Sequence, residues 1–301
     1  MSSPLPAFTF LSDRHREVTD RLHARAADYS QRGRAPSRRA LEAYLAATYD
    51  LLCAPPGATV DEHEFGAWLC LVVFKADDAP TDELAAFLAR PAGAPATTEL
   101  AAAHDDLLSA LAAAGRDTAA LRSSLHTMVE CMLAERTLDR ASLDESHYWR
   151  LRHHTVGGPA YVAVWAALRD LSFPPSARPQ QGRADRLASA LLSLTNDLAS
   201  LARDDASAAR GEPDDLNLVR LRTRRDGSRP AALARTLAEV RDTAGAFTAA
   251  CDALTAAGLA AYAELLRALV RGNLAALEHL EPLRYAGARA LLEPVHAALA
   301  P

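Results

Sequence analysis

Apolar residues recur every three or four positions along almost the whole chain, which leaves few folds open. This spacing places apolar side chains on one face of an α-helix, as in RRALEAYLAATYDLL and LAAYAELLRALVRGNLAALEHL. The alternating β-branched segments and hairpin turns of a sheet protein do not occur in the sequence. Breaks rich in Pro or Gly, such as APPGA (54–58) and RRDGSRP (224–230), are short enough to join neighbouring helices. The sequence therefore predicts an all-α fold without a long interdomain linker.

Composition and charge narrow the class of protein. The 301 residues are 50% hydrophobic with a formal net charge of −5, so the chain can bury a sizeable core but has no electrostatic reason to bind nucleic acid or an anionic membrane. No stretch approaches the roughly 20 apolar residues of a membrane span, and the first residues do not read as a targeting signal. We expect a cytoplasmic protein with a small-molecule ligand. Its four cysteines, without a CxxC pair, are expected to be reduced, buried thiols: Cys53, Cys70, Cys131 and Cys251.

The segment LTNDLASLARDD (194–205) places oxygen-bearing side chains in an apolar helix. Asn196, Ser200 and Asp204 are spaced by four residues, so they project from one helix face. A carboxamide, a hydroxyl and a carboxylate are oxygen donors suited to Mg²⁺. The alternative is a solvated helix face that ends in acidic residues.

A second acidic cluster lies in WLCLVVFKADDAPTDEL (68–84). Because Pro80 disfavours the helical conformation of the preceding residue, the helix is expected to end near Asp78. Asp77 and Asp78 would then lie at a helix C-terminus, where the macrodipole disfavours anions and a bound cation would relieve that cost. Asp82 follows just beyond the proline. The alternative is an acidic helix-to-loop junction without a metal.

Basic residues that suit a diphosphate lie in two other segments. HYWRLRHHTVGGP (147–159) carries Arg150 and Arg152 before a Gly-Gly-Pro break in a helix, and EPLRYAG contributes Arg284 and Tyr285. Arginine suits phosphate because its planar fork donates two parallel hydrogen bonds. Arg150 and Arg152 cannot share one helix face, so only one is expected to point inward. The alternative for each arginine is an ordinary surface position.

These motifs, in this order, resemble those of bacterial class I terpene synthases. The matching elements are DDxxxD (Asp77, Asp78, Asp82), YxxxRxxTxG (Tyr148, Arg152, Thr155, Gly157), NDLxSxxxD (Asn196, Asp197, Ser200, Asp204), NLV (217–219), RGN (271–273) and a terminal Arg284-Tyr285 pair. The resemblance covers about residues 60–290. It implies one class I terpene synthase-like domain over residues 1–301, an α-helical barrel whose mouth binds three Mg²⁺ ions and an isoprenyl diphosphate.

The resemblance also implies a role for each matching residue. The implied metal ligands are Asp77, with Asp78 and Asp82 as ligands or supporting groups, and Asn196, Ser200 and Asp204. The groups implied to sense, polarise or bind the diphosphate are Arg152 as sensor, Thr155 as linker, the backbone around Val156 and Gly157, and Arg203, Arg284 and Tyr285. Two departures from the family matter: Asp204 stands where the family usually has Glu, and Pro80 inside the aspartate motif leaves the role of Asp82 open.

An apolar pocket would exclude the water that quenches a carbocation, and aromatic faces can stabilise the cation. Five aromatic residues lie on helices that carry or adjoin the motifs, and they are the pocket candidates: Phe65, Trp68, Phe74, Tyr161 and Trp165. The alternative for each is ordinary core packing.

The implied activity is that of a carbon–oxygen lyase acting on phosphates. It would ionise a linear C15 or C20 isoprenyl diphosphate with Mg²⁺ and cyclise the carbocation to a terpene hydrocarbon or alcohol, releasing pyrophosphate. A prenyl-chain elongating synthase would share the fold and the metals but normally shows two similar aspartate-rich motifs. A noncatalytic helical protein that binds a ligand or partner through remnant motifs is the third alternative, and the short Asp204 side chain favours it. No nucleic acid or membrane partner is expected, and a homodimer is left open.

Overall fold

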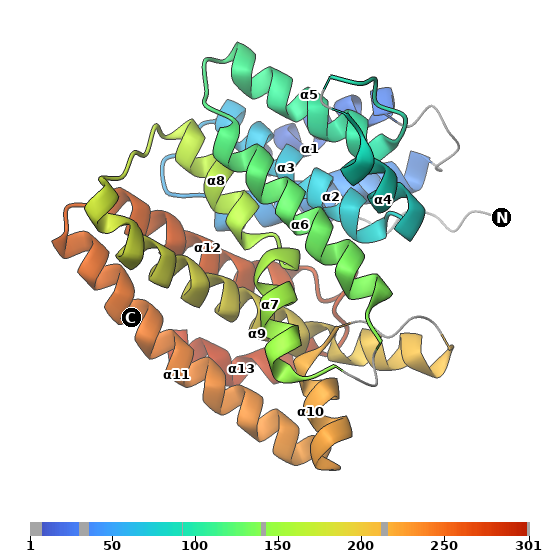
Figure 1. The fold of residues 1–301 in the computed structure, drawn as a ribbon, viewed down its shortest axis with the longest axis vertical. Coiled ribbons are helices and arrows are strands. Elements are labelled where there is room, and N and C mark those ends of the chain that lie inside the picture. Colours follow the sequence, from blue (N-terminus) through green and yellow to red (C-terminus); the bar gives the residue numbers. More distant parts are fainter. Residues whose placement is uncertain (1–7, 30–35, 92, 140–142, 212–215, 300–301) are drawn as a thin grey trace. The chain divides into compact units, whose positions relative to one another are not determined.

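The computed structural model describes residues 8–29, 36–91, 93–139, 143–211 and 216–299 (Figure 1). Within these ranges every regular element is a helix, which confirms the all-α expectation. The elements are α1 (Asp13–Tyr29), α2 (Pro36–Cys53), α3 (Val60–Asp78), α4 (Thr81–Ala89), α5 (Glu99–Ala113), α6 (Ala119–Thr137), α7 (Glu145–Thr155), α8 (Gly158–Leu168), the 3-10 helix η1 (Pro175–Ala177), α9 (Arg178–Ala209), α10 (Leu218–Asp226), α11 (Arg229–Ala256), α12 (Ala260–His279) and α13 (Ala288–Leu299).

The chain forms two compact units. The first comprises Met1–Leu133 with Ala160–Asp170, and the second comprises Ala134–Pro159 with Leu171–Pro301. The first therefore holds the aspartate-rich motif, and the second holds the other motifs. The expectation of a single domain over residues 1–301 stays a prediction.

In the first unit, α1, α2 and α3 pack against one another, and α5 packs on α3. Helix α3 begins with a capping box, in which the Thr59 side chain accepts from the Glu62 N–H and the Glu62 side chain accepts from the Thr59 N–H. It ends at Asp78, two residues before Pro80, as the sequence predicts. These two signals fix where the acidic end of α3 lies in the chain.

A buried carboxylate, Asp50 of α2, organises the interior of the first unit. Its oxygens lie 2.8 Å from His63 Nδ1, 3.0 Å from the Tyr161 hydroxyl and 3.2 Å from Trp165 Nε1. The backbone at Gly66 approaches so closely that a Cβ there would lie 1.9 Å from Asp50 Oδ1. Because a buried carboxylate needs hydrogen-bond donors, this cluster ties α8 to α2 and α3.

Helix α9 is the centre of the second unit, where it contacts α7, α10, α11, α12 and α13. Leu194, Leu198 and Leu201 form its buried stripe, spaced so that they share one face. The long helix α11 runs beside it (Figure 1). The α9 row of oxygen-bearing side chains is thus carried by the helix with the most neighbours in this unit.

All four cysteines are free thiols. Cys53, Cys70 and Cys251 are buried as expected, whereas Cys131 is partly exposed because it lies on the less buried side of α6. None of the helices in the described ranges is long and apolar enough to cross a membrane.

Candidate functional site

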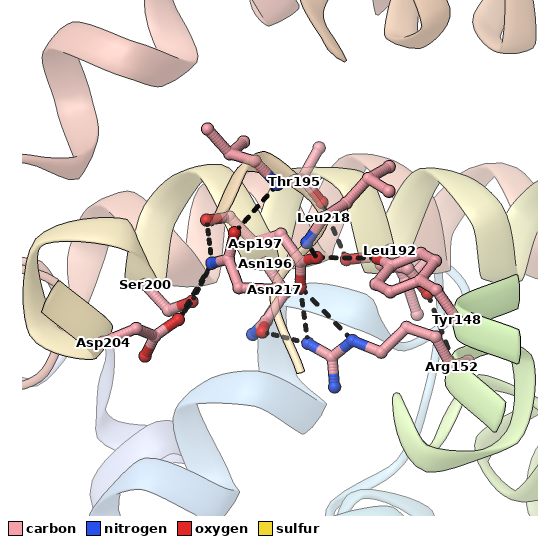
Figure 2. A network of polar contacts seen from close by, with 12 residues as sticks. Tyr148, Arg152, Leu192, Thr195, Asn196, Asp197, Ser200, Asp204, Asn217 and Leu218 are labelled. Carbon is pink, nitrogen blue, oxygen red and sulfur yellow. Dashed lines mark hydrogen bonds and ion pairs between the residues drawn. The ribbon is translucent and has the colours of Figure 1, made fainter. Parts of the chain in front are cut away.

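Asn196, Ser200 and Asp204, which we call the α9 oxygen row, lie on one face of α9, as their four-residue spacing indicates (Figure 2). The Ser200 hydroxyl donates to Asp204 Oδ2 over 2.6 Å, and both residues are 2% exposed. Asn196 continues the row one turn earlier. Asn196 is only partly buried, whereas the buried Ser200 and Asp204 have to be satisfied by specific partners.

Arg152 of α7 is a partner of Asn196. Its Nη2 donates to Asn196 Oδ1 over 2.7 Å, and its Nε and Nη2 lie 3.2 and 2.9 Å from Asp197 Oδ1. Arg150 is exposed on the same helix. The expectation that only one of the two arginines points inward is confirmed, and the inward one is Arg152.

Asp197 is a residue of the site to which the sequence analysis gave no role. It is fully buried and accepts from the Tyr148 hydroxyl over 2.7 Å and from the Leu218 N–H over 2.6 Å, besides Arg152. Burial opposes the charge on Arg152, but the neighbouring groups, of which Asp197 contributes most, together raise the pKa of Arg152 above its usual range. Burial and then the charge of Asp197 also raise the pKa of Tyr148, which stays a neutral phenol and donates its proton. Asp197 therefore fixes α7, α9 and the start of α10 at one point.

Asn217, just before α10, reaches the same row. Its Nδ2 lies 2.9 Å from Asp204 Oδ2 and 2.8 Å from the Asp197 carbonyl oxygen. Its Oδ1 accepts from the Val219 N–H over 3.0 Å and so caps α10. The sequence analysis quoted this residue within NLV without giving it a role.

Asn273, from the RGN element, supports the row from α12. Its Nδ2 donates to Thr195 Oγ1 over 3.0 Å, next to Asn196. Asn273 is 7% exposed, so this amide is part of the core of the second unit. This hydrogen bond links α12 to α9 beside the oxygen row.

The three other residues implied to bind diphosphate also come together in the second unit. Arg203 Nη2 lies 3.1 Å from Asp204 Oδ1. The guanidinium carbons of Arg203 and Arg284 lie 6.0 and 5.9 Å from the ring centroid of Tyr285, which is 2% exposed. Two positive charges therefore stand over one buried aromatic ring beside the end of the oxygen row.

The break after α7 needs two glycines for two different reasons. Gly157 has φ +78°, a backbone conformation that residues with a Cβ rarely adopt. Gly158 opens α8 with an ordinary backbone, but a Cβ there would lie 3.2 Å from Ser189 Oγ and 3.4 Å from Leu192 Cδ2 of α9. The break is thus a sharp turn pressed against α9.

Thr155 and Val156 precede this turn. Val156 ends α7, with its N–H bonded to the Arg152 carbonyl over 3.2 Å. Thr155 is 6% exposed, and its hydroxyl has no hydrogen-bond partner among the residues described here. An unpaired buried hydroxyl costs about 1–3 kcal/mol, so the turn contains a group that would be stabilised by a new partner.

A charged cluster holds the beginning of α7. Glu145, its first residue, accepts from Arg222 Nη2 and Arg225 Nη1, each over 2.8 Å, and from Arg235 Nη2 over 3.1 Å. Arg222 is 1% exposed and bonds Thr236 Oγ1 as well. Helices α10 and α11 therefore fix one end of the helix that carries Arg152. No motif pointed to this cluster, because its members are far apart in sequence.

In the first unit, the aspartate-rich motif is divided between two helices. Asp77 and Asp78 are exposed at the end of α3, and Asp78 Oδ2 lies 2.8 Å from Arg38 Nη2. Asp82 lies in the first turn of α4, where its Oδ1 accepts from the Glu83 N–H over 3.1 Å. Because Pro80 separates the two helices, Asp82 does not continue the α3 face.

The five pocket candidates all lie in the first unit. Tyr161 and Trp165 direct their polar atoms to Asp50, and the guanidinium of Arg25 stands 4.4 Å from the ring centroid of Trp68. Phe65 and Phe74 are partly buried, and Phe74 packs edge-on against Tyr49. Their role in lining a pocket stays a prediction.

The donor set on α9 is compatible with a hard cation. Within the described ranges, no group of three or more His, Cys, Asp or Glu side chains could hold a metal ion. The α9 row contains one carboxylate beside an amide and a hydroxyl, so it would leave coordination positions for other oxygens. Mg²⁺ commonly completes such a set with water and substrate phosphate.

Comparisons with known proteins show what this chain is similar to. A search of curated proteins found no match. Among solved structures, the linalool/nerolidol synthase of Streptomyces clavuligerus, in complex with 2-fluorogeranyl diphosphate, is 23% identical with a TM-score of 0.69, over 88% of this chain and 97% of that chain. The 2-methylisoborneol synthase of Streptomyces coelicolor A3(2), in complex with Mg²⁺ and 2-fluorogeranyl diphosphate, is 20% identical with a TM-score of 0.72, over 95% of this chain and 96% of that chain.

These likenesses establish the all-α fold of class I terpene synthases. The family described as terpene synthase family 2, C-terminal metal binding, matches residues 75–244, more than half of the chain. The chain belongs to this terpene synthase family.

Proposed function

We propose that the protein is a Mg²⁺-dependent terpene cyclase, a carbon–oxygen lyase that ionises a linear C15 or C20 isoprenyl diphosphate and cyclises the resulting carbocation. The observation that carries this proposal is the meeting of the α9 oxygen row with Arg152 at one end and Arg203 at the other. Oxygen ligands beside arginines suit a metal-bound diphosphate. The complexes of the two Streptomyces synthases with 2-fluorogeranyl diphosphate support an isoprenyl diphosphate, without regard to its chain length, as the substrate of this chain.

The proposed metal ligands are Asn196, Ser200 and Asp204 on α9, together with Asp77 and Asp78 on α3. Bound Mg²⁺, three ions in the proposal, would stabilise the negative charge of the departing diphosphate. The donor types support this assignment, and the Mg²⁺ complex of the 2-methylisoborneol synthase is consistent with it.

The arginines would supply the rest of the charge stabilisation. Arg152, Arg203 and Arg284 would donate hydrogen bonds to the diphosphate oxygens, and their positive charges would stabilise the negative charge that develops there. The buried, unpaired hydroxyl of Thr155 lies between Arg152 and the turn at Gly157. This position supports its proposed role as the link between the diphosphate sensor and the turn.

Product analysis tests this function. The purified protein is incubated with Mg²⁺ and, in turn, geranyl, farnesyl and geranylgeranyl diphosphate, and extracts are examined for cyclic products and released pyrophosphate. We expect a cyclic product from farnesyl or geranylgeranyl diphosphate without an isopentenyl donor.

Two outcomes would favour the alternatives. Longer linear diphosphates that appear only when isopentenyl diphosphate is added would identify a prenyl-chain elongating synthase. Binding of the diphosphates without any turnover would identify a noncatalytic binding protein.

A further inference from the structure

The side-chain amide of Asn217 accepts hydrogen bonds through its oxygen and donates through its nitrogen, and these contacts determine its orientation. Its Oδ1 accepts from the Val219 and Arg220 N–H groups over 3.0 and 3.4 Å. A flipped amide would turn its NH₂ group toward these donors and its oxygen toward the Asp204 carboxylate. Because both contacts would then be repulsive, the cap at α10 forces Nδ2 to face α9.

On the α9 side, this Nδ2 meets the predicted metal ligands. It lies 2.9 Å from Asp204 Oδ2 and 3.4 Å from Ser200 Oγ (Figure 2). The same Asp204 oxygen accepts from Ser200 Oγ, while Arg203 takes the other oxygen. Asn217 is 2% exposed, so these hydrogen bonds form away from bulk water.

Because the side chain of Asp204 is short, the hydrogen bond from Asn217 orients its carboxylate. An aspartate carboxylate turns about a single bond beyond Cβ, so one strong donor on Oδ2 fixes the plane of the whole group. A charge-assisted hydrogen bond in a buried setting is suited to this. Holding a ligand in place before the ion arrives reduces the ordering cost of binding, as supporting hydrogen bonds do around metal sites in general.

We propose that Asn217 is a positioning residue for the α9 metal site, which holds the Asp204 carboxylate and the Ser200 hydroxyl in the orientation that binds the ion. This inference rests on the proposed function, since it assumes an ion on the α9 row. Asn217 acts through Asp204 and Ser200 and contributes no ligand of its own.

A purely structural role for Asn217 as a helix cap predicts a different result, so the test separates the two. Asn217→Ser keeps a good N-cap for α10 but replaces the amide group that donates to Asp204 with a shorter hydroxyl. The matched control is Ser228→Ala, which removes the cap of α11, where Ser228 Oγ accepts from the Ala231 N–H over 3.3 Å. The control weakens a cap but leaves the donor to Asp204 in place.

The readout is Mn²⁺ binding, followed by electron paramagnetic resonance in the presence of inorganic pyrophosphate, with melting temperature measured in parallel. We expect Asn217→Ser to weaken Mn²⁺ binding about tenfold, the order expected for a hydrogen bond to a charged group. We expect Ser228→Ala to lower the melting temperature while Mn²⁺ affinity stays at the wild-type value. Unchanged Mn²⁺ affinity in Asn217→Ser, whatever its melting temperature, would overturn the proposed role.

A double-mutant cycle with Asp204→Asn tests the route of the effect. If Asn217 acts through the Asp204 carboxylate, Asn217→Ser has little further effect on Mn²⁺ affinity in the Asp204→Asn background. Additive effects would overturn this route. The wild-type protein tests the proposed function separately. If it fails to bind Mn²⁺ with pyrophosphate, the proposed function and the role of Asn217 fall together, whereas wild-type binding that Asn217→Ser fully retains overturns only the latter.

Discussion

Nη2 of Arg152 donates a 2.7 Å hydrogen bond to Oδ1 of Asn196, so the guanidinium proposed to sense the diphosphate covers the oxygen proposed to bind an ion. A cation at that oxygen would face the positive charge of Arg152. Ion binding at Asn196 would therefore compete with this hydrogen bond. A diphosphate that attracts Arg152 would remove the competition.

The first prediction is that Mn²⁺ and pyrophosphate bind cooperatively. We expect Mn²⁺ affinity to rise at least about tenfold when pyrophosphate is present, a coupling of about 1.4 kcal/mol, and pyrophosphate affinity to rise by the same factor with Mn²⁺. Titration calorimetry in both orders measures the two factors. Equal Mn²⁺ affinity with and without pyrophosphate would contradict the competition at Asn196.

The second prediction concerns the two neighbouring arginines of α7. Arg152→Lys keeps the charge but loses the planar fork that spans Asn196 and Asp197, so we expect kcat to fall at least about tenfold, or about 1.4 kcal/mol of barrier. Arg150→Lys changes an exposed residue of the same helix and is the matched control. Steady-state kinetics on the active diphosphate measures both variants, and the opposite ranking would assign the sensor to Arg150.

The third prediction separates the proposed ligands Asp77 and Asn196 from Asp82, the last aspartate of the DDxxxD motif. We expect Asp77→Ala and Asn196→Ala to abolish turnover with nearly unchanged melting temperature, because both side chains are proposed ligands. Asp82 lies in the first turn of a separate helix, α4, and accepts from the Glu83 N–H. Asp82→Asn should therefore leave turnover within about threefold, as expected for a surface change. Loss of helical structure in the first two variants would instead indicate structural roles.

The fourth prediction is a pH dependence of stability from Asp185. Burial raises the pKa of this carboxyl to about 6, although the Tyr262 hydroxyl donates to it over 2.5 Å. In the unfolded chain its pKa is about 3.9, so the folded state binds the proton more tightly. The stability that this proton gives is present below about pH 4 and is lost as the pH rises through about 6.

Asp185→Asn should therefore flatten the fall in melting temperature between pH 4 and pH 7. The control is Asp252→Asn, which removes an exposed carboxylate on α11. Thermal unfolding of the three proteins across this range measures the difference. A wild-type slope that persists in Asp185→Asn would show that other groups cause it.

The sequence predicted those parts of the site that depend on local spacing. The end of α3 at Asp78 followed from Pro80, and the common face of Asn196 and Ser200 followed from helix periodicity. Asp197 could have been found by the same reasoning. It is spaced three residues from Leu194 and four from Leu201, so it falls beside the buried stripe of α9, where a carboxylate requires partners.

The partners themselves could not be predicted from periodicity. Tyr148 lies 49 residues from Asp197, and Glu145 lies 77 residues from Arg222. Tertiary packing decides which helices face one another. The spacing of residues along one helix carries no information about this packing. The same limit applies to Tyr161 and Trp165, whose bonds to Asp50 cross more than a hundred residues.

The adjacent glycines after α7 should be constrained differently as related sequences diverge. Gly157 is required by its backbone angle, which no change elsewhere in the chain relieves. Gly158 has an ordinary backbone and is crowded only by the side chains of Ser189 and Leu192, so it can change to alanine when position 189 loses its hydroxyl and position 192 becomes smaller. Among relatives, position 158 should therefore covary with two positions of α9, while position 157 stays invariant and covaries with none.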